Sequence, residues 1–413
     1  MRELFKKKIS VEHLKTGMYI TELDMPWLDS PFLLQGFSLI SEEDVAKVQK
    51  ICTFVYIDSQ RGLDVDPKLV IELPPSENPA DVKTNIDKVV YIDKISFEQE
   101  VERANEIRVD TKRIMTNLYE SAKMSTPLDI QGAKEVVDEL VDSVIRNPDA
   151  QMLLTQLKKK DEYTLNHSMN VCVMSLTFGR HLGLPKEDLK ELGLGAMMHD
   201  LGKMKVSDAI LKKPSKLTEE EMEVMRTHPD EGRKLLMAAP ENISARVIEV
   251  AYSHHERMDG AGYPQGMDGE SIPVFARMVM LVDFYDAVTS DRAYHHGESS
   301  SDAMRTIYEE RGIRFDADLS ERFIQCMGVF PLGSLVELGT DEVGIVISLN
   351  RERHLKPKIL LLLDKNKRKY DVPKILDLSR FTKPGQQEIR HVLEPNAYDL
   401  DIRTYLHDLS WAV

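Results

Sequence analysis

The hydrophobic pattern in the middle of the chain limits the fold more than any other feature. From about residue 96 to 325, apolar residues recur at spacings of three and four, as in 133–146, which predicts a series of helices. Strand-like segments occur near the two ends, at 18–21, 54–58, 333–338, 343–347 and 359–363. We therefore expect a multi-domain protein whose mainly α domain lies between two smaller β-containing parts.

Changes in composition along the chain suggest where these parts begin and end. We expect an N-terminal α/β or β module over residues 1–75, with a helix that starts after Ser41, because serine followed by acidic residues favours a helix N-terminus. The polar, proline-bearing stretch 74–79 is typical of a linker, so residues 76–130 are expected to be a linker and a connecting helix. The helical domain then covers 131–328, and a C-terminal β extension covers 329–413.

Charge and cysteine content exclude several classes of protein. The net charge of −15 disfavours binding to a nucleic acid polymer or to an anionic membrane surface. It does not exclude a small phosphate substrate, because bound divalent cations change the local field. The longest aliphatic run, 359–363, is too short to span a membrane. The three cysteines are far apart in sequence, which favours a reducing cytoplasm.

The first candidate for a functional site is the run from Met197 to Lys203. His199 and Asp200 are adjacent at the end of an apolar helical run, so both can reach one metal cluster, and the carboxylate can bridge two cations. Lys203 lies three residues after Asp200 and therefore on the same face, where its ammonium can hold a phosphate oxygen. The alternative interpretation is a solvated His-Asp pair at a helix end.

A second run places His254 and His255 directly before a glycine-rich turn. His228 and Asp283 are further candidate ligands, since an aspartate among apolar neighbours is costly to bury unless a cation compensates its charge. Imidazoles mixed with carboxylates indicate a binuclear iron or manganese centre rather than structural zinc. For Asp286, three residues after Asp283, we expect an ordinary position on the helix surface.

Taken together, these residues resemble the HD-GYP phosphodiesterases. The resemblance covers about residues 130 to 328 and rests on His167, the HDLGK run, His228, the HHERMDGAGYP run, Asp283 and the SDRAY run at 290–294, in that order. It implies an HD-type helical bundle that hydrolyses cyclic di-GMP to linear pGpG and, after a second cleavage, to GMP. The N-terminal part resembles a domain of unknown function often fused ahead of HD-GYP domains, for which we expect a regulatory or dimerising role.

The resemblance also implies a role for each residue. One divalent cation would be held by His167, His199, Asp200 and Asp283, and a second by Asp200, His228, His254 and His255. A hydroxide between the two cations would attack the phosphorus, with Asp200 and Lys203 as catalytic residues. Lys203, Arg292 and Tyr263 would bind the substrate. The loop of Gly262, Tyr263 and Pro264 would contact a partner such as a diguanylate cyclase (GGDEF) domain.

The sequence departs from the family pattern in two places. Some members hold a third cation through a glutamate where this chain has Tyr163, with Glu162 beside it, so we expect a binuclear site. Ala293 replaces a common proline, and His295 and His296 follow in place of a basic residue. Two alternatives therefore stay open, namely a phosphodiesterase for another cyclic dinucleotide such as cyclic GMP-AMP, and a signalling protein that docks through its GYP loop.

Overall fold

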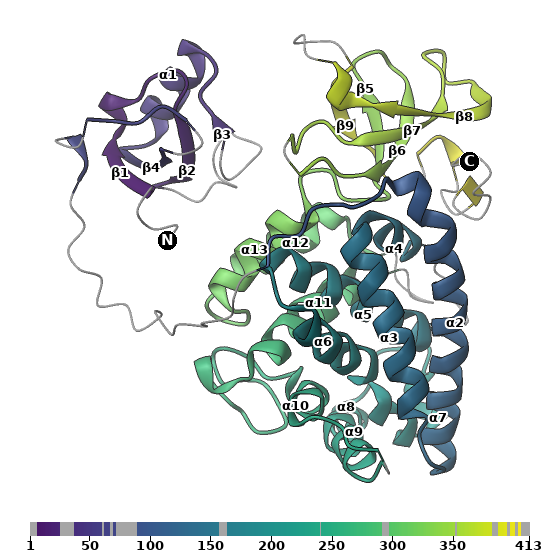
Figure 1. Cartoon of the computed structure of the whole chain (residues 1–413). Helices are drawn as coiled ribbons and strands as arrows, with labels where there is room; N and C mark the ends of the chain where they lie inside the picture. The colour runs from purple at the N-terminus through teal and green to yellow at the C-terminus, as the bar shows by residue number, and fades with distance from the viewer. Residues whose placement is uncertain are drawn as a thin grey trace. The chain divides into compact units, whose positions relative to one another are not determined.

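The structure is a computed structural model that forms two compact units, residues 1–85 and residues 86–413 (Figure 1). It describes residues 6–24, 37–59, 62–66, 69–71, 89–156, 163–239, 241–290, 297–351, 353–381, 387–394, 397–400 and 404–405.

The first unit is a small antiparallel sheet with one helix. Its strand order is β1-β4-β2-β3, and the elements are β1 (Lys6–Ser10), β2 (Tyr19–Leu23), β3 (Phe37–Ser38), α1 (Glu42–Ile51) and β4 (Phe54–Asp58). The Ser41 hydroxyl accepts a hydrogen bond from the Asp44 amide, and the Asp44 carboxylate accepts one from the Ser41 amide, which fixes the start of α1. The strand predicted at 54–58 and the helix start at Ser41 are confirmed.

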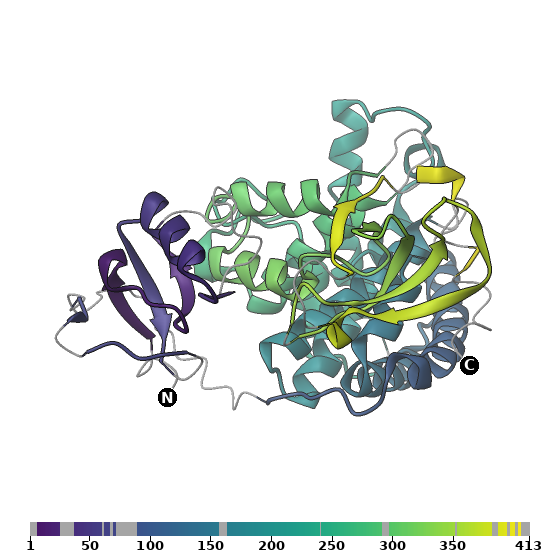
Figure 2. The same cartoon turned by 90° about the horizontal axis from the view of Figure 1, so that it is seen from above.

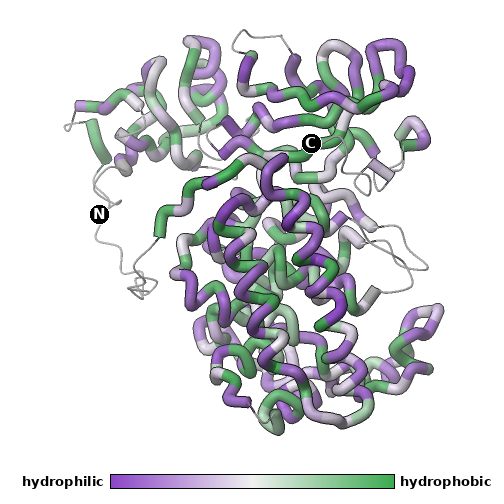
Figure 3. Tube along the Cα trace, turned by 45° about the vertical axis from the view of Figure 1, so that its right-hand side comes forward, coloured by the Kyte–Doolittle hydropathy of each residue, from purple (hydrophilic) through white to green (hydrophobic). Residues whose placement is uncertain are grey.

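The second unit is built around a helical body. Its helices are α2 (Phe97–Met124), α3 (Ile130–Arg146), α4 (Pro148–Leu154), α5 (Tyr163–Leu182), α6 (Lys186–Met198), α7 (Asp208–Leu211), α8 (Glu219–Met225), α9 (His228–Met237), α10 (Ala245–Ser253), α11 (Val274–Thr289), α12 (Ser300–Glu309) and α13 (Ala317–Met327). The tube in Figure 3 alternates between hydrophobic and hydrophilic colour along these helices, as expected where one face is buried. None of the helices within the described ranges is long and apolar enough to cross a membrane.

Helix α2, which the sequence placed in the connecting segment, packs along α3 and α4. The fully buried carboxylate of Glu100 on α2 accepts hydrogen bonds from the Ser143 hydroxyl (2.7 Å) and from two guanidinium nitrogens of Arg146 (2.7 Å each) on α3. These bonds tie α2 to the helical body. The domain boundaries given by the sequence stay predictions.

The C-terminal part is a five-stranded antiparallel sheet with the order β8-β7-β6-β5-β9, seen from above in Figure 2. Its strands are β5 (Leu335–Leu338), β6 (Val343–Ser348), β7 (Lys358–Leu363), β8 (Lys369–Asp377) and β9 (Ile389–Val392). The three predicted strands are confirmed, and so is the expected fold class. The sequence analysis missed β8 and β9, because both are mostly exposed and lack an apolar run.

A polar seam fastens this sheet to the helical body. Asp149, at the start of α4 and 1% exposed, accepts hydrogen bonds from the Ser348 hydroxyl (2.8 Å), the Leu349 amide (2.8 Å) and Arg351 (2.7 Å). Arg351 also donates to Asp93 (2.6 Å). A buried carboxylate with three donors is stable only while all of its partners are in place.

We expect Asp149→Ala to lower the free energy of unfolding by about 3–5 kcal/mol, because it leaves a buried amide, a hydroxyl and a guanidinium without their acceptor. Urea unfolding followed by circular dichroism at 222 nm measures the change. The control is Asp110→Ala, whose exposed pair with Arg113 on α2 is expected to contribute at most about 1 kcal/mol. Equal stabilities of the two variants would contradict the role of the seam.

Candidate metal centre

Five segments of the helical body bring their histidines and aspartates to one place. The seven side chains form two groups, Asp200 with His228, His254 and His255, and His167 with His199 and Asp283. Within each group the potential ligand atoms lie within 4.8 Å of one another. They come from α5 (His167), the end of α6 (His199 and Asp200), the start of α9 (His228), the end of α10 (His254 and His255) and α11 (Asp283).

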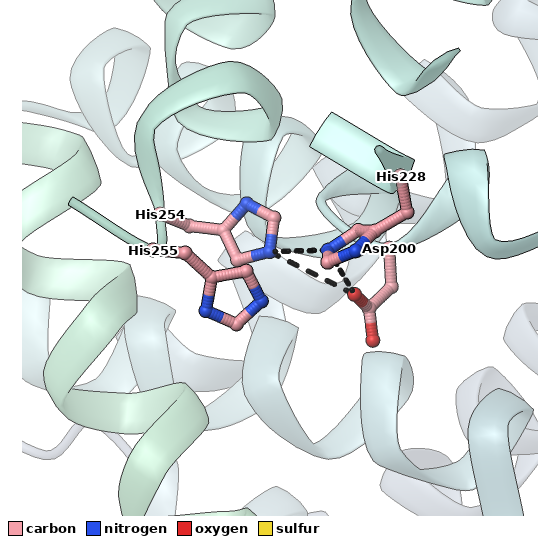
Figure 4. Close-up of side chains that lie close together, drawn as sticks. All are labelled: Asp200, His228, His254 and His255. Carbon is pink, nitrogen blue, oxygen red and sulfur yellow. Dashed lines mark hydrogen bonds and ion pairs between the residues drawn. The ribbon is translucent and has the colours of Figure 1, made fainter. Parts of the chain in front are cut away.

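The Asp200 carboxylate lies between the two groups and presents one oxygen to each. Its Oδ1 is 3.4 Å from His228 Nε2 and 3.7 Å from His254 Nε2 (Figure 4). Its Oδ2 is 3.3 Å from His199 Nε2 and 3.7 Å from His167 Nε2. A carboxylate placed in this way can bridge two cations. The sequence analysis derived the same grouping from a resemblance, and the role of the seven residues as ligands stays a prediction.

Three of the histidines are oriented by the backbone. The Nδ1 atoms of His199, His228 and His254 lie 2.7, 2.8 and 3.0 Å from the carbonyl oxygens of the residues three positions earlier, Ala196, Met225 and Ala251. A carbonyl oxygen only accepts, so each Nδ1 must carry the proton and donate it. In the neutral ring the lone pair is then on Nε2, which faces the cluster in all three residues.

The surroundings favour the neutral form of His228, His254 and His255. Burial lowers the pKa of His228 to about 3, and the Lys203 ammonium adds to this effect. Burial also lowers the pKa of His254, although the Asp200 carboxylate opposes it. The pKa of His255 lies well below its usual value because of desolvation and the neighbouring His254. A neutral imidazole is the form that binds a metal ion.

Several atoms of the cluster cannot satisfy one another by hydrogen bonds but could bind a cation. His228 Nε2 and His254 Nε2 are 3.2 Å apart, and with both protons on Nδ1 two lone pairs face each other. Among the described residues, His199 Nε2 and Asp200 Oδ1 are buried without a hydrogen-bond partner. A buried polar atom without a partner costs about 1–3 kcal/mol. Divalent cations between these atoms would satisfy all of them, so the residues present fit a metal centre.

His167 is held differently, by two aspartates of α11. Its Nε2 is 2.9 Å from Asp283 Oδ1, and its Nδ1 is 2.8 Å from Asp286 Oδ2. Burial alone would lower the pKa of His167, but the two carboxylates outweigh it and raise the pKa to about 9. Asn170 donates to the other oxygen of Asp286 (3.1 Å). Asp286 is therefore the outer partner that orients a histidine whose Nε2 faces the cluster.

The prediction that Asp286 is a surface residue is wrong, since its side chain is fully buried. The spacing in the sequence did carry a signal. Residues three apart share a helix face, so Asp286 had to point to the same side of α11 as Asp283. The sequence did not show that His167 on α5 lies beside α11, where it becomes the hydrogen-bond partner of Asp286.

The segment after Asp200 is pressed against the start of α9. The short 3-10 helix η6 (Leu201–Lys205) places the Lys203 ammonium 2.5 Å from Asp200 Oδ2. A Cβ atom on Gly202 would lie 1.9 Å from the His228 carbonyl oxygen and 2.4 Å from the Gly232 amide nitrogen. Only glycine permits this approach, which brings Asp200 and His228 together.

The glycine-rich loop after His255 is attached to the cluster through Glu256. This carboxylate is fully buried and accepts hydrogen bonds from the amides of Gln265 (2.7 Å) and Met267 (2.9 Å). A Cβ on Gly262 would lie 2.5 Å from Glu256 Cα. The Tyr263 ring, which precedes Pro264 in a cis peptide bond, stacks on the His255 ring at 4.7 Å. The sequence analysis did not consider Glu256.

Some predicted features fall outside the described residues. These are Arg292, Ala293, His295, His296 and Glu162, and no side-chain position is described for Tyr163. Their roles in phosphate binding and in the number of cations stay predictions. The docking of a partner on Gly262, Tyr263 and Pro264 also stays a prediction.

The chain matches known families along most of its length. Residues 151–319 match the HD domain family, residues 6–133 match a domain of unknown function (DUF3391), and residues 335–396 match a KOW domain associated with HD domains. A cyclic di-GMP phosphodiesterase of Pseudomonas aeruginosa, PA4108, is 34% identical over 384 residues, which cover 91% of this chain and 89% of that protein.

Two further relatives match a shorter part. The cyclic di-GMP phosphodiesterase response regulator RpfG of Xanthomonas campestris is 42% identical over 135 residues, covering 33% of this chain and 36% of that protein. The 3'3'-cGAMP-specific phosphodiesterase 1 of Vibrio cholerae is 33% identical over 162 residues, covering 39% of this chain and 37% of that protein.

We expect Asp286→Ala to weaken metal binding by about 10- to 100-fold, because His167 loses the carboxylate that orients its ring. Asp286→Asn should lose less, since an amide oxygen can still accept from Nδ1. Competition with a chelator measures the affinity for Mn²⁺, and Asp318→Ala, which removes an exposed carboxylate on α13, is the control. Unchanged affinity in Asp286→Ala would contradict the positioning role.

The two glycines that pack together, Gly202 and Gly232, provide a matched pair. Gly202→Ala should lower the free energy of unfolding by about 1–3 kcal/mol and reduce the metal content, because the new methyl group overlaps the backbone of α9. Gly232→Ala should be tolerated, since its nearest neighbour would be 3.5 Å away. Thermal unfolding and metal analysis of both variants test this. A Gly202→Ala protein with the stability and metal content of the wild type would show that the close contact between η6 and α9 is not required.

Proposed function

Because the chain belongs to the HD-GYP family of HD-domain phosphohydrolases, we propose that it hydrolyses cyclic di-GMP to linear pGpG in a metal-dependent reaction. One observation carries this proposal. The Asp200 carboxylate directs its two oxygens to two separate groups of ligands, which is the arrangement needed to hold two cations side by side.

In this proposal each cation has its own set of ligands. One would be held by His167, His199, Asp283 and Asp200, and the other by His228, His254, His255 and Asp200. Imidazoles mixed with carboxylates favour iron or manganese. When bound, such cations lower the pKa of water enough to supply a nucleophile at neutral pH, and they neutralise charge on the phosphoryl oxygens.

The chain's own residues complete the site. Lys203 is 21% exposed, so its ammonium can hold an oxygen of the scissile phosphate while it stays next to Asp200. Tyr263 closes one side of the cluster and covers the His255 ring. The buried ends of α6 and α10 keep bulk water away from the ligand atoms, which strengthens the electrostatic interactions at the reacting phosphate.

A second candidate substrate is cyclic GMP-AMP. The 3'3'-cGAMP-specific phosphodiesterase 1 of Vibrio cholerae is similar to this chain over only 39% of its length. The relative named for cyclic di-GMP covers 91%, which favours cyclic di-GMP. Kinetics on the two cyclic dinucleotides separate these candidates, and a strong preference for the mixed one would replace our choice.

We expect anaerobically purified protein to contain about two metal ions per chain and to convert cyclic di-GMP to pGpG, because the cluster offers two ligand groups. Asp200→Ala should lose turnover while its helix content is unchanged, since the bridging carboxylate is removed. Asp110→Ala, on the exposed face of α2, is the control.

The measurements are metal content and time-resolved separation of the products. Retained hydrolysis in metal-loaded Asp200→Ala would contradict the proposal. Metal-loaded wild-type protein that leaves both cyclic dinucleotides intact would also contradict it, and would favour a binding role.

A further inference from the structure

Arg226 is a cation beside the cluster that no step of the reaction uses. It follows the last residue of α8 and precedes His228 by two positions. Its guanidinium lies over the Tyr263 ring, 5.9 Å from the centroid, and the same ring stacks on His255 with the centroids 4.7 Å apart. The guanidinium and a histidine of the cluster therefore contact the same tyrosine ring.

Among the residues that the structure describes, Arg226 has no ion-pair partner. Within the part of the chain that the structure describes, no carboxylate lies within ion-pair distance of its guanidinium, although Glu223 is only three residues earlier on α8. Two other basic groups of the described residues already have partners. Lys203 is bound to Asp200 at 2.5 Å, and Arg314 is 3.4 Å from Glu310 and packs on the rings of Phe284 and Phe315.

A cyclic dinucleotide brings two phosphodiester groups into this site, and only one of them can lie on the metal cluster. The second phosphate then lies away from the cations of the cluster, where a basic side chain would neutralise its charge. A guanidinium is suited to this task, since its planar fork matches two phosphate oxygens and it can rest on an aromatic ring at the same time.

We propose that Arg226, held against the Tyr263 ring, binds the phosphate of the cyclic dinucleotide that is not being cleaved. This inference rests on the proposed function and adds to it a determinant of substrate class. Arg226 would favour diesters that carry a second phosphate close to the first over diesters that have only one. It would act on substrate binding, while the attack takes place at the cluster.

The test compares two substrates of one enzyme. Cyclic di-GMP has two phosphates, whereas bis(p-nitrophenyl) phosphate has a single one and depends on the metal cluster alone. We expect Arg226→Ala to lower kcat/KM for cyclic di-GMP by about 10- to 100-fold, mainly through KM, because a charge-assisted contact is lost. The single-phosphate diester should change by less than about twofold. Arg226→Lys should fall between wild type and Arg226→Ala.

Arg233 provides the matched control. Its guanidinium lies 4.6 Å from the ring of Tyr252, a residue that is not part of the cluster, so Arg233→Ala removes the same charge and the same type of ring contact. It should leave both activities unchanged. An equal loss on both substrates in Arg226→Ala, or no loss on either, would overturn the inference. Wild-type protein that cleaves bis(p-nitrophenyl) phosphate but neither cyclic dinucleotide would instead overturn the proposed function, and this inference with it.

Discussion

The buried carboxylate of Asp200 sets the conditions that the helical body has to meet. Its side chain is fully buried, and an ion in that position is stable only if positive charge or donors surround it. Burial raises the pKa of Asp200, but the groups around it, the Lys203 ammonium among them, outweigh burial and hold the pKa well below its usual value. Helices α6, α9 and α10, which carry His199, His228 and His254, therefore end or begin around one point.

Helix ends are what make this convergence possible. The carbonyl groups of the last turn of a helix have no partner within the helix. At the ends of α6, α8 and α10, the Nδ1 atoms of His199, His228 and His254 donate to such carbonyls, and each bond turns the Nε2 atom toward the cluster. The same interaction thus satisfies the helix end and selects the tautomer that can bind a metal ion.

The outer layer of the site explains why residues without ligand atoms are needed there. Asp286 fixes the ring of His167, Glu256 holds the glycine-rich loop, and Gly202 permits η6 to touch α9. Each of these contacts joins segments that are far apart in sequence. The polar seam around Asp149 does the same for the C-terminal sheet, which makes that sheet part of the second unit rather than a free appendage.

The sequence alone determined the fold class and the residue types of the site, because helical periodicity, strand runs and the HDLGK and HHERMDGAGYP segments are local features that need no partner to be seen. It could not place Asp286, whose role depends on a histidine 119 positions away. It also could not show that Asp200 has one oxygen for each ligand group, or that Arg226 lies over Tyr263. Those facts depend on how α5, α8 and α11 pack, and packing is decided by side-chain shape and burial across the whole unit, which short-range patterns do not encode.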